Sequence, residues 1–234
     1  MEAMEIVRPW EGKGYDIRYA LFDFDGTISL IREGWQNIMI PYFVEVLKET
    51  GTSESDAHLL SVVTDFVDTL TGKQTIYQCI ALDEEVVKRG GPHRDPLVYK
   101  HEYLRRLEIR IENRKKALEA GTEDPEAHLL GLDGVFAGGI HGAHDHMLSC
   151  SKELVIRDML EKEGIKPNQL VSFGDGYVEV ELVANLGGLA IGAATNEETR
   201  EGINEWKRNR LITAGANAII PDFRNRIEIL DAIL

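Results

Sequence analysis

Cysteine is scarce in this chain, with only Cys79 and Cys150 among 234 residues. Two thiols are too few for the disulfide framework that stabilises small secreted domains, and their spacing is not that of a zinc-binding cysteine pair. The scarcity therefore predicts reduced thiols and a cytoplasmic location.

Long apolar runs and blocks of basic residues are also absent from the sequence. No stretch approaches the about 18 apolar residues that a membrane span needs, and residues 1–5 lack the basic and apolar regions of a signal peptide. Acidic residues number 40 against 26 Lys and Arg, which gives a formal net charge of −14. The sequence predicts no membrane span and no nucleic-acid partner, because binding phosphate backbones requires a basic surface.

What the sequence does contain is a change from helical to alternating patterns along its length. Residues 18–24 form an apolar run that ends in acids and a glycine, as in a buried strand that opens into a site. Apolar residues then recur at helical spacing as far as residue 118. After residue 129 the predicted elements alternate: helices over 153–163, 178–185, 199–208 and 227–234, and strands over 170–173, 189–191 and 218–220.

Such alternation predicts an α/β fold with parallel strands and crossover helices. We expect a core made of residues 15–30 and 121–234, interrupted by an all-helical insertion over residues 31–120. Because ligands bind at the C-terminal ends of parallel strands, the acidic ends of the strands over 18–24 and 170–173 mark the expected site.

Two carboxylates follow the first predicted strand in the string Asp23-Phe24-Asp25-Gly26-Thr27. In that setting one acid can attack phosphorus while the other protonates the leaving oxygen and later activates water. An isolated Asp-Gly pair is usually only a turn, but the full string is expected by chance in roughly a few per thousand chains of this length. The string indicates phosphoryl-transfer chemistry.

A second acidic motif follows the strand over 170–173, where Asp175 and Glu179 stand four positions apart. On one side of a nascent helical turn their oxygens can reach a hard cation directly or through water, and Mg²⁺ is the natural occupant. Otherwise they are acids that complement a helix N-terminus. Lys152 opens the preceding predicted helix, where a lone lysine is usually solvated, but here it can place its ammonium over a shared phosphate.

These three motifs, in this order and interrupted by helices, resemble the haloacid dehalogenase-like (HAD) hydrolase superfamily over nearly the whole chain. The resemblance implies a Rossmannoid parallel sheet with helices on both faces and an inserted all-helical cap domain. A cap directly after the first motif is of the type shared with β-phosphoglucomutase and phosphoglycolate phosphatase.

The resemblance also implies the roles of the motif residues. It makes Asp23 the nucleophile and Asp25 the general acid and base, and it implies Mg²⁺ held by Asp23, the backbone carbonyl of Asp25 and Asp175. Glu179 would hold metal-bound water. Phosphate binding is implied for Phe24, Gly26, Thr27 and Lys152. Phosphatases and mutases of the superfamily keep the second aspartate that dehalogenases lack, so Asp25 favours phosphoryl chemistry.

One expected part, a Ser or Thr at the end of an apolar strand, has no clear counterpart. No apolar run of strand length occurs between residues 103 and 134. Thr122, in a Gly-Thr-Glu-Asp turn, is the candidate for phosphate binding, and its alternative role is the N-cap of the next helix. Either the core has lost a central strand, or the sequence lacks a segment near Ala120. The second interpretation is favoured, and a Cα separation far above about 3.8 Å between neighbours there would support it.

Three histidines lie within residues 141–146. Histidines this close together can bind zinc, but a carboxylate-rich magnesium site elsewhere already supplies a metal. The favoured interpretation is a polar loop near the mouth of the active site.

Together the motifs predict a hydrolase, a Mg²⁺-dependent phosphatase that acts on small phosphorylated metabolites such as sugar phosphates through an aspartyl-phosphate intermediate. A phosphosugar mutase or another phosphotransferase would use the same core and is one alternative. A non-catalytic regulatory or ligand-binding module is the alternative from another class.

Overall fold

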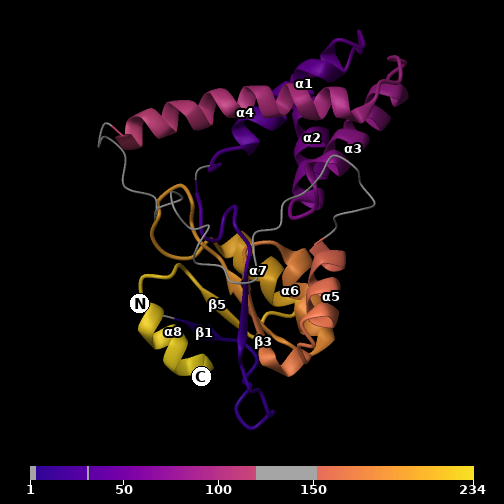
Figure 1. The fold of residues 1–234 in the computed structure, drawn as a ribbon. Coiled ribbons are helices and arrows are strands. Elements are labelled where there is room, and N and C mark those ends of the chain that lie inside the picture. Colours follow the sequence, from indigo (N-terminus) through magenta and orange to yellow (C-terminus); the bar gives the residue numbers. More distant parts are fainter. Residues whose placement is uncertain (1–3, 31, 120–151) are drawn as a thin grey trace. The chain divides into compact units, whose positions relative to one another are not determined.

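The computed structural model describes residues 4–30, 32–119 and 152–234 (Figure 1). Contacts divide these residues into two compact units. The first, here called the sheet unit, contains the described residues up to 33 and those from 152 onward; the second, the helical unit, contains residues 34–119. Within the described ranges, every helix is too short or too polar to cross a membrane.

The sheet unit is built on five strands in the order β1-β5-β4-β3-β2. Four of them, β2 to β5, pair in parallel, and β1 pairs with β5 in the antiparallel sense. The strands are β1 Glu5–Ile6, β2 Tyr19–Phe22, β3 Leu170–Gly174, β4 Leu189–Ala193 and β5 Ala218–Ile220. The predicted α/β class with parallel strands is confirmed, whereas β1 was not predicted because two residues carry no readable pattern.

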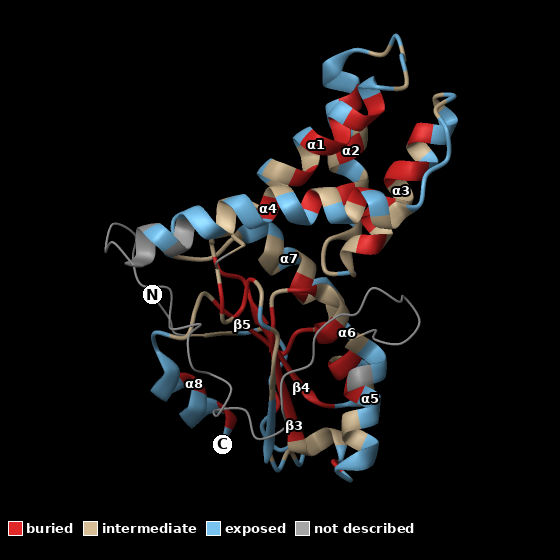
Figure 2. Cartoon of the chain, turned by 45° about the horizontal axis from the view of Figure 1, so that its top comes forward, coloured by how far each residue is buried: buried red, intermediate tan, exposed pale blue. Residues whose placement is uncertain are grey.

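Helices cover both faces of this sheet (Figure 1). They are α5 Lys152–Lys162, α6 Tyr177–Leu186, α7 Glu205–Ala214 and α8 Arg226–Ile233. Ile156 of α5, Val180 of α6 and Leu211 of α7 share one apolar core, and Ile229 of α8 belongs to the other. Figure 2 shows β3, β4 and β5 as buried, which is why their sequences are apolar at nearly every position.

The helix predicted over 199–208 is displaced in the structure, where α7 begins at Glu205 and ends at Ala214. Arg200 and Gly202 have φ angles of 56° and 76°, which no right-handed helix contains. The side chain of Asn204 then accepts a hydrogen bond from the backbone N–H of Lys207, as an N-cap does. The prediction of a helix from residue 199 is wrong for that reason, and the true start places Lys207 in the first turn.

The helical unit consists of α1 Gln36–Lys48, α2 Asp56–Leu70, α3 Thr75–Lys88 and α4 Pro96–Glu119. Its core contains Phe43, Leu59, Leu82 and Tyr103, each from a different helix and each without exposed surface. A helical region after β2 is therefore confirmed. The sequence did not single out α3, because buried polar residues such as Gln78 and Asp83 interrupt its apolar pattern.

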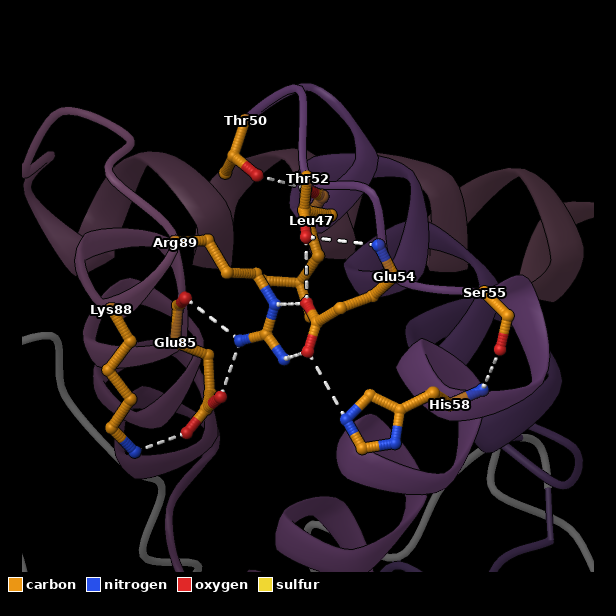
Figure 3. Close-up of polar contacts among 9 residues, drawn as sticks. All are labelled: Leu47, Thr50, Thr52, Glu54, Ser55, His58, Glu85, Lys88 and Arg89. Carbon is orange, nitrogen blue, oxygen red and sulfur yellow. Dashed lines mark hydrogen bonds and ion pairs between the residues drawn. The ribbon is translucent and has the colours of Figure 1, made fainter.

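A group of charged side chains ties the segment before α2 to the end of α3 (Figure 3). Arg89, only 9% exposed, pairs with Glu54 and with Glu85, the latter at 2.6 Å. Lys88 adds a contact of 2.5 Å to Glu85, and His58 lies 3.2 Å from Glu54. Because Arg89 and Lys88 stand at the C-terminal end of α3, their charge also complements the helix dipole. We call these five residues the Arg89 cluster.

Candidate active site

Two acids of the predicted site leave neighbouring parallel strands at the same edge of the sheet. Asp23 follows β2, Asp175 follows β3, and the two strands pair in register with Phe22 opposite Phe173. The backbone N–H of Asp23 donates a 2.8 Å hydrogen bond to the carbonyl of Phe173. The sheet register therefore brings together two carboxylates that stand far apart in the sequence.

Glu179, in the first turn of α6, completes a cluster of three acids. Asp23, Asp175 and Glu179 each offer one carboxylate oxygen, and these oxygens all lie within 4.8 Å of one another. The Glu179 side chain is only 4% exposed. Burial, together with the charge of Asp23, raises the pKa of both Asp175 and Glu179, because a carboxylate loses hydration when it is buried. Such a cluster attracts positive charge.

Glycine allows the first and second motifs to approach closely. Gly26 has a φ angle of +83°, and a Cβ atom at this position would lie 2.2 Å from Oδ2 of Asp175. Any larger residue would displace the acid. On the other side, Glu179 accepts a 2.9 Å hydrogen bond from the backbone N–H of Gly176, which fixes its carboxylate toward the start of its own helix.

Lys152, the first residue of α5, lies against this cluster. Its Nζ is 3.0 Å from Oδ2 of Asp23 and 2.9 Å from Oε2 of Glu179. Burial by itself would lower the pKa of Lys152, but the charges of Glu179 and Asp23 outweigh it and raise the pKa. The side chain is thus held as an ammonium ion beside Asp23, and its contact with phosphate stays a prediction.

A second lysine at the site, Lys207, was not predicted. Its Nζ lies 2.7 Å from Oδ2 of Asp175 and also pairs with Glu197, which follows β4. One sequence signal was available. The helix dipole disfavours a lysine in the first turn of a helix, so such a lysine indicates that acids nearby compensate for this cost. That signal becomes specific only once the start of α7 is known.

The remaining residues of the first motif lie outside the acid cluster or support it. Asp25 is turned to Arg32, whose Nη1 lies 2.6 Å from its Oδ2. Thr27, predicted to contact phosphate, is buried and its Oγ1 accepts a 3.0 Å hydrogen bond from the backbone N–H of Asp175. The carbonyl of Phe24 accepts the backbone N–H groups of the turn that follows it. In this structure Thr27 and Phe24 therefore shape the loop.

Two parts of the prediction lie outside the described residues. They are Thr122 with the connection near Ala120, and the histidine loop over 141–146. Both stay predictions, and so do the domain bounds.

The donors at the site fit a hard divalent cation. The ligand atoms available are carboxylate oxygens, which suit Mg²⁺, whereas zinc sites are built mainly from Cys and His. Four carboxylates, of Asp23, Asp175, Glu179 and Glu197, meet two ammonium groups, of Lys152 and Lys207. Carboxylates therefore outnumber ammonium groups at the site, which favours the binding of a further cation.

No family model and no curated protein sequence matches this chain. Among solved structures, a conserved haloacid dehalogenase-like protein of unknown function from Agrobacterium tumefaciens is 19% identical, with a TM-score of 0.56 over 93% of this chain and 99% of that one. A putative β-phosphoglucomutase from Bacteroides vulgatus is 18% identical, with a TM-score of 0.50 over 94% and 91%. This likeness shows the fold, and it agrees with the predicted α/β class with a helical region after β2.

Proposed function

We propose that this protein is a Mg²⁺-dependent phosphatase that hydrolyses small phosphomonoesters through an aspartyl-phosphate on Asp23. The observation that carries the proposal is the cluster of Asp23, Asp175 and Glu179, with the ammonium of Lys152 3.0 Å from Asp23. A nucleophilic carboxylate, further acids for a cation and a fixed ammonium are the parts that transfer of a phosphoryl group requires.

Asp23 is the group that attacks phosphorus. A new bond forms between its carboxylate oxygen and phosphorus while the bond to the leaving oxygen breaks, and the ester alcohol departs after it gains a proton. Lys152 stabilises the negative charge of the transferring group, because its ammonium already lies beside Asp23. Asp23, Asp175, Glu179 and the backbone carbonyl of Asp25 would hold Mg²⁺, which when bound neutralises charge on the phosphoryl oxygens.

Asp25 is the proposed source of the proton for the leaving alcohol. In the second half of the reaction it accepts a proton from the water that hydrolyses the aspartyl-phosphate, and this restores Asp23. Oδ2 of Asp25 contacts Arg32 in the structure. We expect this contact to open before that oxygen donates a proton to the substrate.

The direct test is phosphate release from p-nitrophenyl phosphate in the presence of Mg²⁺. Wild-type protein should release phosphate, and Asp23→Asn should not, because the amide is a poor nucleophile. The matched control is Asp158→Asn, the same change at an exposed acid of α5 that forms an ion pair with Lys162, one helical turn away. Full activity of Asp23→Asn, in protein freed of contaminating phosphatases, would reject the proposal.

A phosphosugar mutase is the second candidate, because the fold likeness includes a protein described as a putative β-phosphoglucomutase. The same site would pass the phosphoryl group to another sugar hydroxyl instead of water. Incubation with a panel of sugar phosphates distinguishes the two: isomerised sugar phosphate indicates a mutase, and free phosphate indicates a phosphatase. Mg²⁺ binding without turnover of any phosphate ester would indicate the non-catalytic alternative.

A further inference from the structure

Lys207 is a largely buried cation outside the motifs from which the function is proposed. Its side chain is only 12% exposed, although it stands in the first turn of α7, where the helix dipole disfavours positive charge. Burial of an ammonium group also costs hydration free energy. Two acids offset these costs, since Asp175 and Glu197 raise the pKa of Lys207 against the lowering effect of burial.

The contacts of Lys207 join two loops at the C-terminal edge of the sheet. Asp175 follows β3, and Glu197 lies in the segment between β4 and α7. That segment is itself closed by a bridge between Thr195 and Ile203 and by a hydrogen bond from the N–H of Asn204 to the carbonyl of Ala194. These backbone contacts hold the segment that carries Glu197 against the start of α7, and the two acids then fix the position of the Lys207 ammonium.

Asp175 is held from two sides. Thr27 accepts its backbone N–H at 3.0 Å, and Lys207 contacts its carboxylate oxygen Oδ2 at 2.7 Å. Glu179 is supported in a parallel way, by the N–H of Gly176 and by Lys152. Within the cluster, Lys152 therefore serves both Asp23 and Glu179, whereas Lys207 contacts Asp175.

We propose that Lys207 is a positioning residue that holds the carboxylate of Asp175 in place for a divalent cation. It acts through Asp175, and the proposal rests on the metal site of the proposed function. Groups that orient metal ligands typically contribute roughly 10- to 100-fold to metal affinity.

A competing account makes the opposite prediction about the sign of the effect. If Lys207 were only a counter-charge that substitutes for the cation, its removal would leave the site more negative and would tighten Mg²⁺ binding. If it positions Asp175, its removal lets the carboxylate move and weakens Mg²⁺ binding. The direction of the change in affinity therefore separates the two accounts.

The experiment is a calorimetric titration of MgCl₂ into protein stripped of metal with a chelator. We expect Lys207→Met to weaken Mg²⁺ binding by roughly 10- to 100-fold and Lys207→Arg to restore most of it, because a guanidinium can contact both acids. The matched control, Lys162→Met, removes an exposed lysine that pairs with Asp158 and should leave the affinity unchanged. Circular dichroism checks that each variant is folded.

Should Lys207→Met not fold, Lys207→Gln keeps a polar side chain at the buried position, and the same loss of affinity is expected of it. Equal or tighter Mg²⁺ binding by a folded Lys207 variant overturns the positioning role and leaves the proposed function standing. If the wild-type protein binds no Mg²⁺, or if Asp175→Asn binds it as well as the wild type does, the metal site itself is refuted and this inference with it.

Discussion

Two groups of charged side chains in this protein have different balances of acid and base. In the Arg89 cluster of the helical unit, a buried guanidinium is surrounded by carboxylates, and the pKa values of Glu54 and Glu85 are lowered. In the acid cluster of the sheet unit, buried and half-buried carboxylates outnumber the lysines, and the pKa values of Asp175 and Glu179 are raised. The first group is satisfied within the chain, whereas the second has acid in excess.

This difference distinguishes a structural ion cluster from a candidate functional one. A structural cluster needs no further partner and stabilises the elements that it joins. A cluster with surplus buried negative charge destabilises the fold unless a cation neutralises it, and perturbed carboxyl groups of this kind concentrate at functional sites. Changes in the two clusters should therefore affect different properties: binding and turnover in one, and stability in the other.

The largest effect on Mg²⁺ affinity is expected from Asp175→Asn. The change removes a charged ligand from the candidate metal site and leaves the contact from Lys207 without its carboxylate. Mg²⁺ affinity and Mg²⁺-dependent turnover should both fall by more than the roughly 100-fold that loss of a supporting residue causes. Calorimetry and phosphate release measure the two quantities. An Asp175→Asn variant with normal Mg²⁺ affinity would contradict the assignment of the acid cluster.

Lys152→Met should lower kcat by about 10²- to 10³-fold, in the range seen when a group that stabilises transition-state charge is removed. Its ammonium contacts Asp23, the proposed nucleophile, as well as Glu179. We therefore expect its removal to slow the phosphoryl-transfer step. Steady-state kinetics with p-nitrophenyl phosphate measures the change. Lys162→Met, in the same helix, is the control. A raised KM with unchanged kcat would show that Lys152 only binds substrate.

Addition of Mg²⁺ should raise the Tm of the wild-type protein, because the ion neutralises the surplus acid of the folded state and binds the unfolded chain weakly. At a free concentration 100 times the Kd the gain is about 2.7 kcal/mol, and 1 kcal/mol shifts the Tm of a domain of this size by roughly 2 to 4 °C. Asp23→Asn and Asp175→Asn should lose this response, and Arg89→Met should keep it. If Arg89→Met also lost the Mg²⁺-dependent rise in Tm, the ion would not bind at the acid cluster alone.

Arg89→Met should lower the Tm by several degrees without affecting Mg²⁺ affinity. It removes the common partner of Glu54 and Glu85 and separates the start of α2 from the end of α3 (Figure 3). Arg105→Met is the matched control, because Arg105 forms an exposed pair with Glu102 in α4, and such pairs contribute little. Thermal melts compare the two variants, and equal melting temperatures would show that burial of Arg89 contributes nothing.

The smallest effect concerns acid pH. The hydrogen bond from Arg89 is the main cause of the lowered pKa of Glu54; for Glu85, burial acts in the opposite direction but Lys88 and Arg89 outweigh it. Acids whose pKa is lower in the folded state stabilise it above their unfolded-state pKa, and this stability is lost as the pH falls through the folded-state pKa. Melts from neutral to acid pH should therefore show a steeper loss of Tm below about pH 4.5 for wild type than for Arg89→Met. If Tm fell in parallel with pH for the wild type and Arg89→Met, the pairing of Arg89 with Glu54 and Glu85 would not be the cause.

Local patterns explain which parts of the fold were predictable. The strands over 170–173 and 218–220 are buried on both faces, so nearly every residue in them is apolar and their positions could be predicted closely. The start of α7 was missed because the sequence over 199–204 has a helix-like pattern, whereas Arg200 and Gly202 adopt left-handed backbone that excludes a helix there. The two-residue strand β1 depends on its pairing with β5, which no local pattern records.

The candidate site divides in the same way. Asp23 and Asp175 were predictable because both follow apolar strands, and parallel strands end at one edge of a sheet. Lys207 reaches Asp175 across 32 positions of sequence, and Glu197 joins it from another loop. Contacts of that kind depend on the register of β3 against β4 and on where α7 begins. For the same reason the pairing of Asp25 with Arg32 and the support that Thr27 gives to Asp175 emerge only from the structure.

The central claim is that Asp23 carries the phosphoryl group during turnover. The most direct measurement is mass spectrometry of a reaction with p-nitrophenyl phosphate, quenched rapidly in acid and digested. The account predicts phosphate on the peptide that contains Asp23, dependent on Mg²⁺ and absent from Asp23→Asn. Wild-type turnover without a phosphorylated Asp23 at any quench time, or phosphate found on another residue, would contradict it.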